Sequence, residues 1–186
     1  MPSSIQLTDE ELVLRPFHLN DTAQLYCAVK ESLNELKPWM SWAIDGYNER
    51  TAREYIAIAR ARWEEHTYYA LAVTRRDELL GACTLSSIHS LYRFCNLGYW
   101  VRTSCHGQGI AGRAAKLAAR FAIERLGLIR VEIVIAAGNQ ASIRVAEKIG
   151  AHEEGTLLNR IVVGKSIYNA HMYSLIPSDF GLAARL

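Results

Sequence analysis

Hydrophobic positions recur along the chain with two different periods, which predicts a protein built from both helices and strands. Apolar residues spaced by three and four predict helices from Asn20 or Asp21 to residue 36, over residues 49–66, from Ile110 towards Gly127, and over residues 142–149. Alternating or continuous apolar runs predict strands over residues 11–16, 68–74, 79–87, 94–101, 130–137, 151–161 and 167–176. This order predicts an α+β fold in which helices cover both faces of a sheet of about seven strands.

The same spacing predicts which helix faces are buried. In the first helix the expected core residues are Leu25, Val29, Leu33 and Leu36. In the second helix the residues expected near one buried face are Tyr55, Ile58, Ala59, Arg62 and Trp63. Both faces have the stripe of an amphipathic helix that packs on a sheet.

Composition narrows the class of protein. The chain of 186 residues is 50% hydrophobic, enough for one compact domain over residues 1–186. A net charge of +2 without a run of basic residues argues against direct binding of nucleic acid. Because neither a signal-peptide pattern nor an apolar run of about 20 residues is present, we expect a cytoplasmic protein that does not cross a membrane. The spacing of the four cysteines matches no zinc or redox pattern, which predicts free thiols and no metal site.

The most informative segment is a strand, a glycine loop and a helix between residues 98 and 127. The loop consists of Gly107, Gln108, Gly109, Ile110, Ala111 and Gly112. Small residues at a helix start leave backbone N–H groups free to bind an anion such as a pyrophosphate. The spacing matches neither the P-loop of nucleotide triphosphatases nor the G-x-G-x-x-G dinucleotide fingerprint.

The motif HGQGIAG after the strand LGYWV resembles the acetyl-CoA loop of the GNAT superfamily of N-acetyltransferases, whose pattern is Q/R-x-x-G-x-G/A. His106 stands at the Q/R position, Gly109 at the central glycine and Ala111 at the last position. A second motif, NQASIRVAEKIGA from Asn139 to Ala151, is similar to the family's N-x-x-S/A helix. With the N-terminal RPF segment, these motifs resemble the RimJ/RimL branch, which acetylates the N-termini of ribosomal proteins.

The resemblance implies a GNAT fold, a mostly antiparallel mixed sheet with acetyl-CoA as cosubstrate in the splay between its two middle strands. The residues it implies for binding acetyl-CoA are Trp100, Val101, Arg102, His106, the loop from Gly107 to Gly112, Asn139 and Ser142. By the same resemblance, Ser142 serves as the proton donor near the sulfur, although a hydroxyl at a helix start is also an ordinary cap. Many members carry a tyrosine seven positions after the asparagine, where this chain has Ala146.

The general base is an open question, because the branch usually has a glutamate where this chain has Asn96. An amide accepts no proton near neutral pH. Either a water relay or a group such as Glu54, Glu132, His89 or Tyr99 takes the proton, or an amine of low pKa arrives neutral. An α-amine has a pKa of about 8 against roughly 10.4 for lysine, which favours N-terminal acceptors.

Residues 38–48 place Trp39, Met40, Trp42 and Tyr47 in a connection between helices. We expect Trp39 and Trp42 in the wall of the substrate pocket or a partner surface, with packing in the core as an equal alternative. The predicted function is transfer of acetyl to a protein N-terminus. A small amine acceptor and a non-catalytic acyl-CoA sensor are the alternatives, and homodimer formation is left open.

Overall fold

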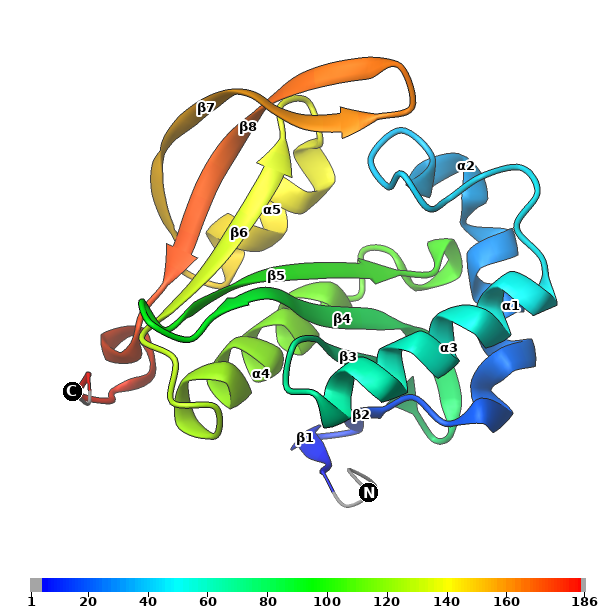
Figure 1. The fold of residues 1–186 in the computed structure, drawn as a ribbon, viewed down its shortest axis with the longest axis horizontal. Helices are drawn as coiled ribbons and strands as arrows, with labels where there is room; N and C mark the ends of the chain where they lie inside the picture. The colour runs from blue at the N-terminus through cyan, green and yellow to red at the C-terminus, as the bar shows by residue number, and fades with distance from the viewer. Residues whose placement is uncertain (1–4, 185–186) are drawn as a thin grey trace.

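A computed structural model describes residues 5–184 of the chain, and Figure 1 shows one twisted sheet with helices on both sides. The strands are Leu7–Asp9 (β1), Leu12–Pro16 (β2), Tyr69–Arg75 (β3), Glu78–His89 (β4), Phe94–Val101 (β5), Arg130–Ala136 (β6), His152–Val163 (β7) and Ser166–Leu175 (β8). The α-helices are Thr22–Glu31 (α1), Leu33–Leu36 (α2), Glu49–Glu64 (α3), Ile110–Glu124 (α4) and Gln140–Lys148 (α5). Short 3-10 helices cover Leu19–Asp21, Thr103–Cys105 and Pro177–Phe180.

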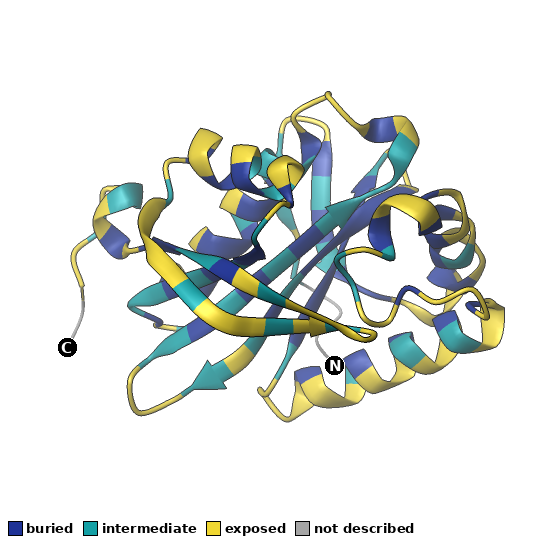
Figure 2. Cartoon of the chain, turned by 90° about the horizontal axis from the view of Figure 1, so that it is seen from above, coloured by how far each residue is buried: buried dark blue, intermediate teal, exposed yellow. Residues whose placement is uncertain are grey.

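The predicted α+β class is confirmed. The sheet has eight strands in the order β1-β2-β3-β4-β5-β6-β8-β7. The strand that the sequence analysis missed is β1, whose three residues are too few to show a period. One core cluster lies between the sheet and α4 with α5, and a second lies beneath α1, α2 and α3. Buried and intermediate positions alternate along the middle strands β5 and β6, and Figure 2 shows this alternation, whereas β7 is mostly exposed.

The middle of the sheet splits. β5 pairs with β4 in antiparallel fashion along most of its length, up to Val101 opposite Gly81. With β6 it forms a parallel pair of three positions, which ends at Asn96 opposite Glu132. Beyond this point β6 continues with β8 and β5 continues with β4, so the sheet opens into a V that is visible in Figure 1.

The first predicted helix is not continuous, which corrects the expectation of one helix to residue 36. Ser32 separates α1 from α2 with φ −101° and ψ 8°, and its hydroxyl donates to the carbonyl of Ala28 at 2.8 Å. The Ser32 hydroxyl oxygen also accepts from the backbone N–H of Thr103 at 3.0 Å. A serine that bonds back to the preceding turn and to a distant segment competes with helix continuation.

The predicted face of α3 is wrong in part. Ile58, expected in the core, is 58% exposed, whereas Ile56 is fully buried. The buried stripe is Ala52, Ile56, Ala59 and Trp63. Tyr55 is partly buried against the second core cluster, as expected, whereas Ile58 points away from it, because the packing of α3 selects Ile56 for the buried stripe.

An ion pair and a hydrogen bond join the end of α1 to the connection between β5 and α4. Arg102 forms ion pairs with Glu31 of α1 and with Glu78 of β4, the latter at 2.8 Å. Glu31 also accepts from the backbone N–H of Ser104 at 2.8 Å. The hydrogen bond from Arg102, followed by that from Ser104, lowers the pKa of Glu31 from 4.5 to about 2.

This cluster predicts a pH-dependent contribution to stability. A carboxylate with a lowered folded pKa stabilises the fold above its unfolded pKa of 4.5, and the gain is lost as pH falls towards about 2. Glu31→Gln is expected to lower the free energy of unfolding at pH 7 by about 1 kcal/mol, the scale of partly shielded pairs, and to flatten the loss between pH 4.5 and 2.

Denaturant unfolding at several pH values measures this effect. The matched control is Glu54→Gln, whose pair with Arg50 on α3 is far more exposed. An equal acid sensitivity of wild type and Glu31→Gln would contradict the assignment.

Candidate functional site

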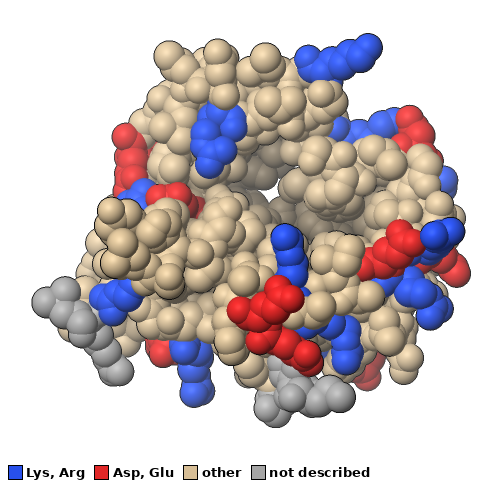
Figure 3. Space-filling view, in the orientation of Figure 1, with Lys and Arg blue, Asp and Glu red and all other residues tan. Residues whose placement is uncertain are grey.

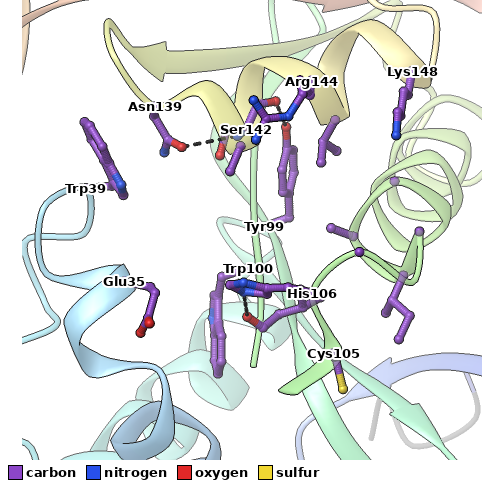
Figure 4. Close-up of a pocket in the computed structure, with 18 of the residues that line it drawn as sticks. Glu35, Trp39, Tyr99, Trp100, Cys105, His106, Asn139, Ser142, Arg144 and Lys148 are labelled. Carbon is purple, nitrogen blue, oxygen red and sulfur yellow. Dashed lines mark hydrogen bonds between the residues drawn. The ribbon is translucent and has the colours of Figure 1, made fainter. Parts of the chain in front are cut away.

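A cleft of about 780 Å3 lies in the split of the sheet and appears as the hollow at the centre of Figure 3. Its walls come from the end of β5, the glycine loop, the first turns of α4, one face of α5, and α2 with the segment after it. Figure 4 shows that α5 and the residues around Trp100 lie on opposite sides of this space. The cleft therefore forms where strands β5 and β6 leave each other.

The glycine loop offers a row of backbone donors. Among the described residues, none accepts a hydrogen bond from the N–H groups of residues 107–112, and the first backbone bond of the helix runs from Arg113 to Gly109 at 3.1 Å. Gly109 precedes α4 with φ 74°, a left-handed conformation that favours glycine. Six successive free N–H groups at a helix N-terminus form a ready anion site.

Basic side chains surround the same end of the cleft. Lys116 of α4 and Arg144 and Lys148 of α5 line it, and none of the three is paired within the part of the chain that the structure describes. Arg113 also lines the cleft, but Asp9 at 2.7 Å and Glu10 at 3.0 Å compensate its charge. The free cations and the helix terminus together give this end a positive potential suited to phosphates.

The open edge of β5 carries further backbone groups that have no partner on a neighbouring strand. The N–H of Arg102 donates to Leu80 of β4 at 2.8 Å. Because backbone groups alternate in direction along an antiparallel strand, those of Tyr99 and Val101 point away from β4 and into the split. The Val101 carbonyl lies 3.2 Å from Nε2 of His106. The strand therefore presents donors and acceptors to any extended ligand in the cleft.

Helix α5 forms the wall of the cleft opposite β5. The Asn139 side chain caps it by accepting from the N–H of Ser142 at 3.2 Å, so the cap is Asn139 and not Ser142. The Ser142 hydroxyl lines the cleft and has no hydrogen-bond partner among the described residues. The Tyr99 phenol donates to the Ser142 carbonyl at 3.0 Å, which joins β5 to α5 across the cleft.

Most residues predicted for the site line one cleft. They are Trp39, Tyr99, Trp100, Val101, His106, Gly107, Gly109, Ile110, Ala111, Gly112, Asn139 and Ser142. Four others lie elsewhere, and one of them, Asn96, is at the apex of the split. Arg102 is held by Glu31 and Glu78, and the Gln108 amide donates to the Ser104 carbonyl at 3.1 Å. Trp42 packs outside the cleft, with its ring centroid 6.0 Å from that of Trp100.

Asn96 and the candidate bases named in the sequence analysis lie away from the cleft, apart from Tyr99. Asn96 is at the apex of the split, where its Oδ1 is buried without a partner among the described residues. Glu132 is paired with Arg130 at 2.8 Å, and His89 is stacked between Tyr92 and Phe94. Exposed Glu54 is on α3.

Tyr99 remains in the cleft, but burial raises the pKa of its phenol well above the usual value. A phenol of this kind stays neutral near pH 7 and acts as a hydrogen-bond donor, in agreement with its bond to Ser142.

Several charged residues of the cleft were not assigned to the site from the sequence, among them Arg113 and Lys116 of α4 and Glu35 of α2. Glu35 lines the end opposite the basic residues and lies beside Trp100 in Figure 4. Its place in the sequence is that of an ordinary polar residue on an amphipathic helix, and no local motif distinguishes it.

Comparison with known proteins places this cleft in a family. Residues 11–152 match the acetyltransferase (GNAT) domain. The chain belongs to the GNAT acetyltransferase family. The resemblance found in the glycine loop and in the α5 motif is thereby confirmed, and the chain is an N-acetyltransferase by family.

Relatives of this acetyltransferase carry related names. A putative ribosomal N-acetyltransferase, YdaF of Bacillus subtilis, is 26% identical over 173 residues, which are 92% of this chain and 94% of that protein. A solved structure of a putative ribosomal-protein-serine acetyltransferase from Vibrio cholerae is 27% identical, with a TM-score of 0.82 over 95% of this chain and all of the other.

A complex of RimL, a ribosomal L7/L12 α-N-protein acetyltransferase, with coenzyme A has a TM-score of 0.86. It covers 92% of this acetyltransferase and 98% of RimL, and at 19% identity the likeness shows the fold. Within residues 5–184, no group of three or more His, Cys, Asp or Glu side chains is placed to hold a metal ion. In the same range, no helix is both long and apolar enough to span a membrane.

The glycine loop predicts a pair of variants with similar strain, of which only one should weaken CoA binding. Gly109 and Gly127, at the two ends of α4, have φ 74° and 69°, and a Cβ at either position meets nothing within 4 Å. Alanine at each should therefore cost a similar strain of about 1–2 kcal/mol. Gly109→Ala should also weaken CoA binding by about tenfold or more, because a methyl group and a shifted backbone disturb the free N–H groups.

Calorimetric titration of CoA into both variants tests this prediction, with thermal unfolding as the measure of strain. Gly127→Ala should bind as wild type does. Equal CoA affinity of Gly109→Ala and wild type would remove the loop from the binding site.

Proposed function

We propose that this acetyltransferase moves the acetyl group of acetyl-CoA to the α-amine of a protein or peptide N-terminus. The observation that carries the proposal is the row of free N–H groups at residues 107–112, which opens into the same cleft as the unpaired Ser142 hydroxyl. An anion site and a proton donor in one cleft suit acyl transfer from a phosphate-bearing thioester. The names of the relatives support the choice of acceptor.

In this proposal each wall of the cleft has one task. The glycine loop binds the pyrophosphate, with Lys116, Arg144 and Lys148 near the phosphates. The free backbone groups of β5 bind the pantetheine arm, and a β5 N–H stabilises the oxyanion. These residues fit acetyl-CoA, because the pyrophosphate and the pantetheine arm follow each other in this molecule. The free donors of the glycine loop and of β5 follow each other in the same order along the cleft.

The reaction forms a C–N bond and breaks a C–S bond. The neutral amine attacks the thioester carbonyl, the amine nitrogen loses a proton, and the departing sulfur gains one. We assign donation to the sulfur to Ser142, whose hydroxyl is uncommitted because Asn139 supplies the helix cap. The amine proton leaves to water, since Asn96 accepts none and Glu132 is held by Arg130.

The rim of the cleft favours a polypeptide acceptor. The β7–β8 hairpin contacts the α2 side through Tyr168, whose ring centroid lies 6.0 Å from that of Trp39. On the same hairpin, Leu158, Val162 and Ile167 are each more than 60% exposed. Exposed apolar side chains next to a reaction site are typical of a surface that receives another chain.

The proposal predicts that Ser142→Ala lowers kcat by about 10² or more while the Kd for acetyl-CoA changes less than about twofold, because a proton donor acts in the transition state. Ser166→Ala on the exposed hairpin is the matched control and should leave both constants unchanged. Steady-state kinetics and calorimetry measure the two quantities. A fall in kcat below about threefold would leave Ser142 without a catalytic role.

A panel of acceptors tests the substrate class. One set of peptides has a free α-amine, and the other set is N-acetylated, so that only a lysine side chain can accept the acetyl group. We expect kcat/KM at pH 7 to be about tenfold or more higher for the first set. CoA release and the mass of the product report the transfer. Faster reaction with a polyamine or an aminoglycoside would favour a small-amine acceptor, and no CoA release with any amine would favour an acyl-CoA sensor.

A further inference from the structure

The end of the cleft away from the phosphates has a composition of its own. Glu35 is the one acidic side chain among the described residues that line the cleft, whereas four basic residues line the opposite end on α4 and α5. Figure 4 shows Glu35 beside Trp100, with Trp39 higher on the same side, and Arg144 and Lys148 across the space. The two ends of the cleft therefore carry opposite charges, with cations at one end and a carboxylate at the other.

The charge of Glu35 is not neutralised by its neighbours. Within residues 5–184 it forms no hydrogen bond or ion pair. Lys37, two positions later, is paired with Asp45 at 2.5 Å. Arg102, which follows β5, is held by Glu31 and Glu78. A carboxylate that faces a cleft without a protein cation is available to a cation in a ligand.

Two indole rings line the same end of the cleft as this carboxylate and are fixed by packing. The Trp39 ring contacts Tyr168 of β8 and lies 3.6 Å from the position that a Cβ on Gly138 would take. The Trp100 ring packs against Trp42, with 6.0 Å between ring centroids. Ring faces attract cations, and the attraction grows when the cation loses water.

We propose that Glu35, Trp39 and Trp100 form a binding subsite for the protonated amine of the acceptor. This inference rests on the proposed function, in which the acceptor is a primary amine. Most α-amines are protonated at pH 7, so the species that first enters the cleft is a cation. The carboxylate and the rings collect that cation at the end opposite the phosphates, and the amine then loses its proton to water before attack. Glu35 thus selects cationic acceptors and sets their orientation.

The test combines kinetics with binding of two isosteric peptides. For an accepted peptide, Glu35→Gln should raise KM about tenfold, with kcat within about threefold and the Kd for acetyl-CoA unchanged. Glu49→Gln, which removes an exposed acid outside the cleft at the start of α3, is the matched control and should behave as wild type. A KM for Glu35→Gln within twofold of wild type would overturn the proposal.

The binding arm does not depend on turnover. Two analogues of the same peptide carry either a trimethylammonioacetyl cap, which is permanently cationic, or the neutral 3,3-dimethylbutanoyl cap of the same shape. Wild type and Glu49→Gln should bind the cationic analogue more tightly, by about fivefold or more, and Glu35→Gln should bind both alike. Equal affinity of wild type for the two analogues, or no binding of either, would overturn the subsite.

The two proposals fail in different ways. If no amine releases CoA but the preference for the cationic analogue depends on Glu35, the proposed function fails and the subsite stands. If peptides are acetylated and Glu35→Gln changes neither KM nor the preference, the subsite fails and the proposed function stands. A Trp39→Leu variant that keeps the full preference would limit the subsite to Glu35 and Trp100, contrary to the proposal.

Discussion

The early end of pairing between β5 and β6 is the constraint on which the rest of the structure depends. Three paired positions join the strands, and beyond Asn96 each follows a different neighbour. Backbone groups on the open edge of β5 are left without strand partners, a cost that a ligand or water must offset. Because α4 begins at the same opening, its free N–H groups face the same space.

The split remains narrow because contacts cross it at several levels. Tyr99 of β5 donates to the backbone of Ser142 on α5, and a Cβ at Gly112 would meet Ile149 at 3.3 Å, which shows how closely α4 approaches the end of α5. At the opposite end, Trp39 contacts Tyr168. In the functions proposed here, these contacts leave a single cleft that two substrates enter from ends of opposite charge, and the substrates meet at Ser142.

Features that depend on a few neighbouring residues were predictable from the sequence. The start of α4 at Ile110 follows from a glycine that tolerates a left-handed backbone. The hairpin between β3 and β4 and the α+β class follow from apolar periods and their order. The family could be identified for the same reason, because its two motifs are each local in the chain.

Features that depend on distant contacts were decided by the tertiary structure. Ser32 ends α1 because it bonds Thr103, and Ile56 is buried in place of Ile58 because of how α3 packs on the sheet. Glu35 looks like any polar helix residue until the fold sets it in the cleft beside Trp100. Periodicity and capping are set within a few residues of sequence, whereas the residues that share a cleft are chosen by the packing of segments far apart in the chain.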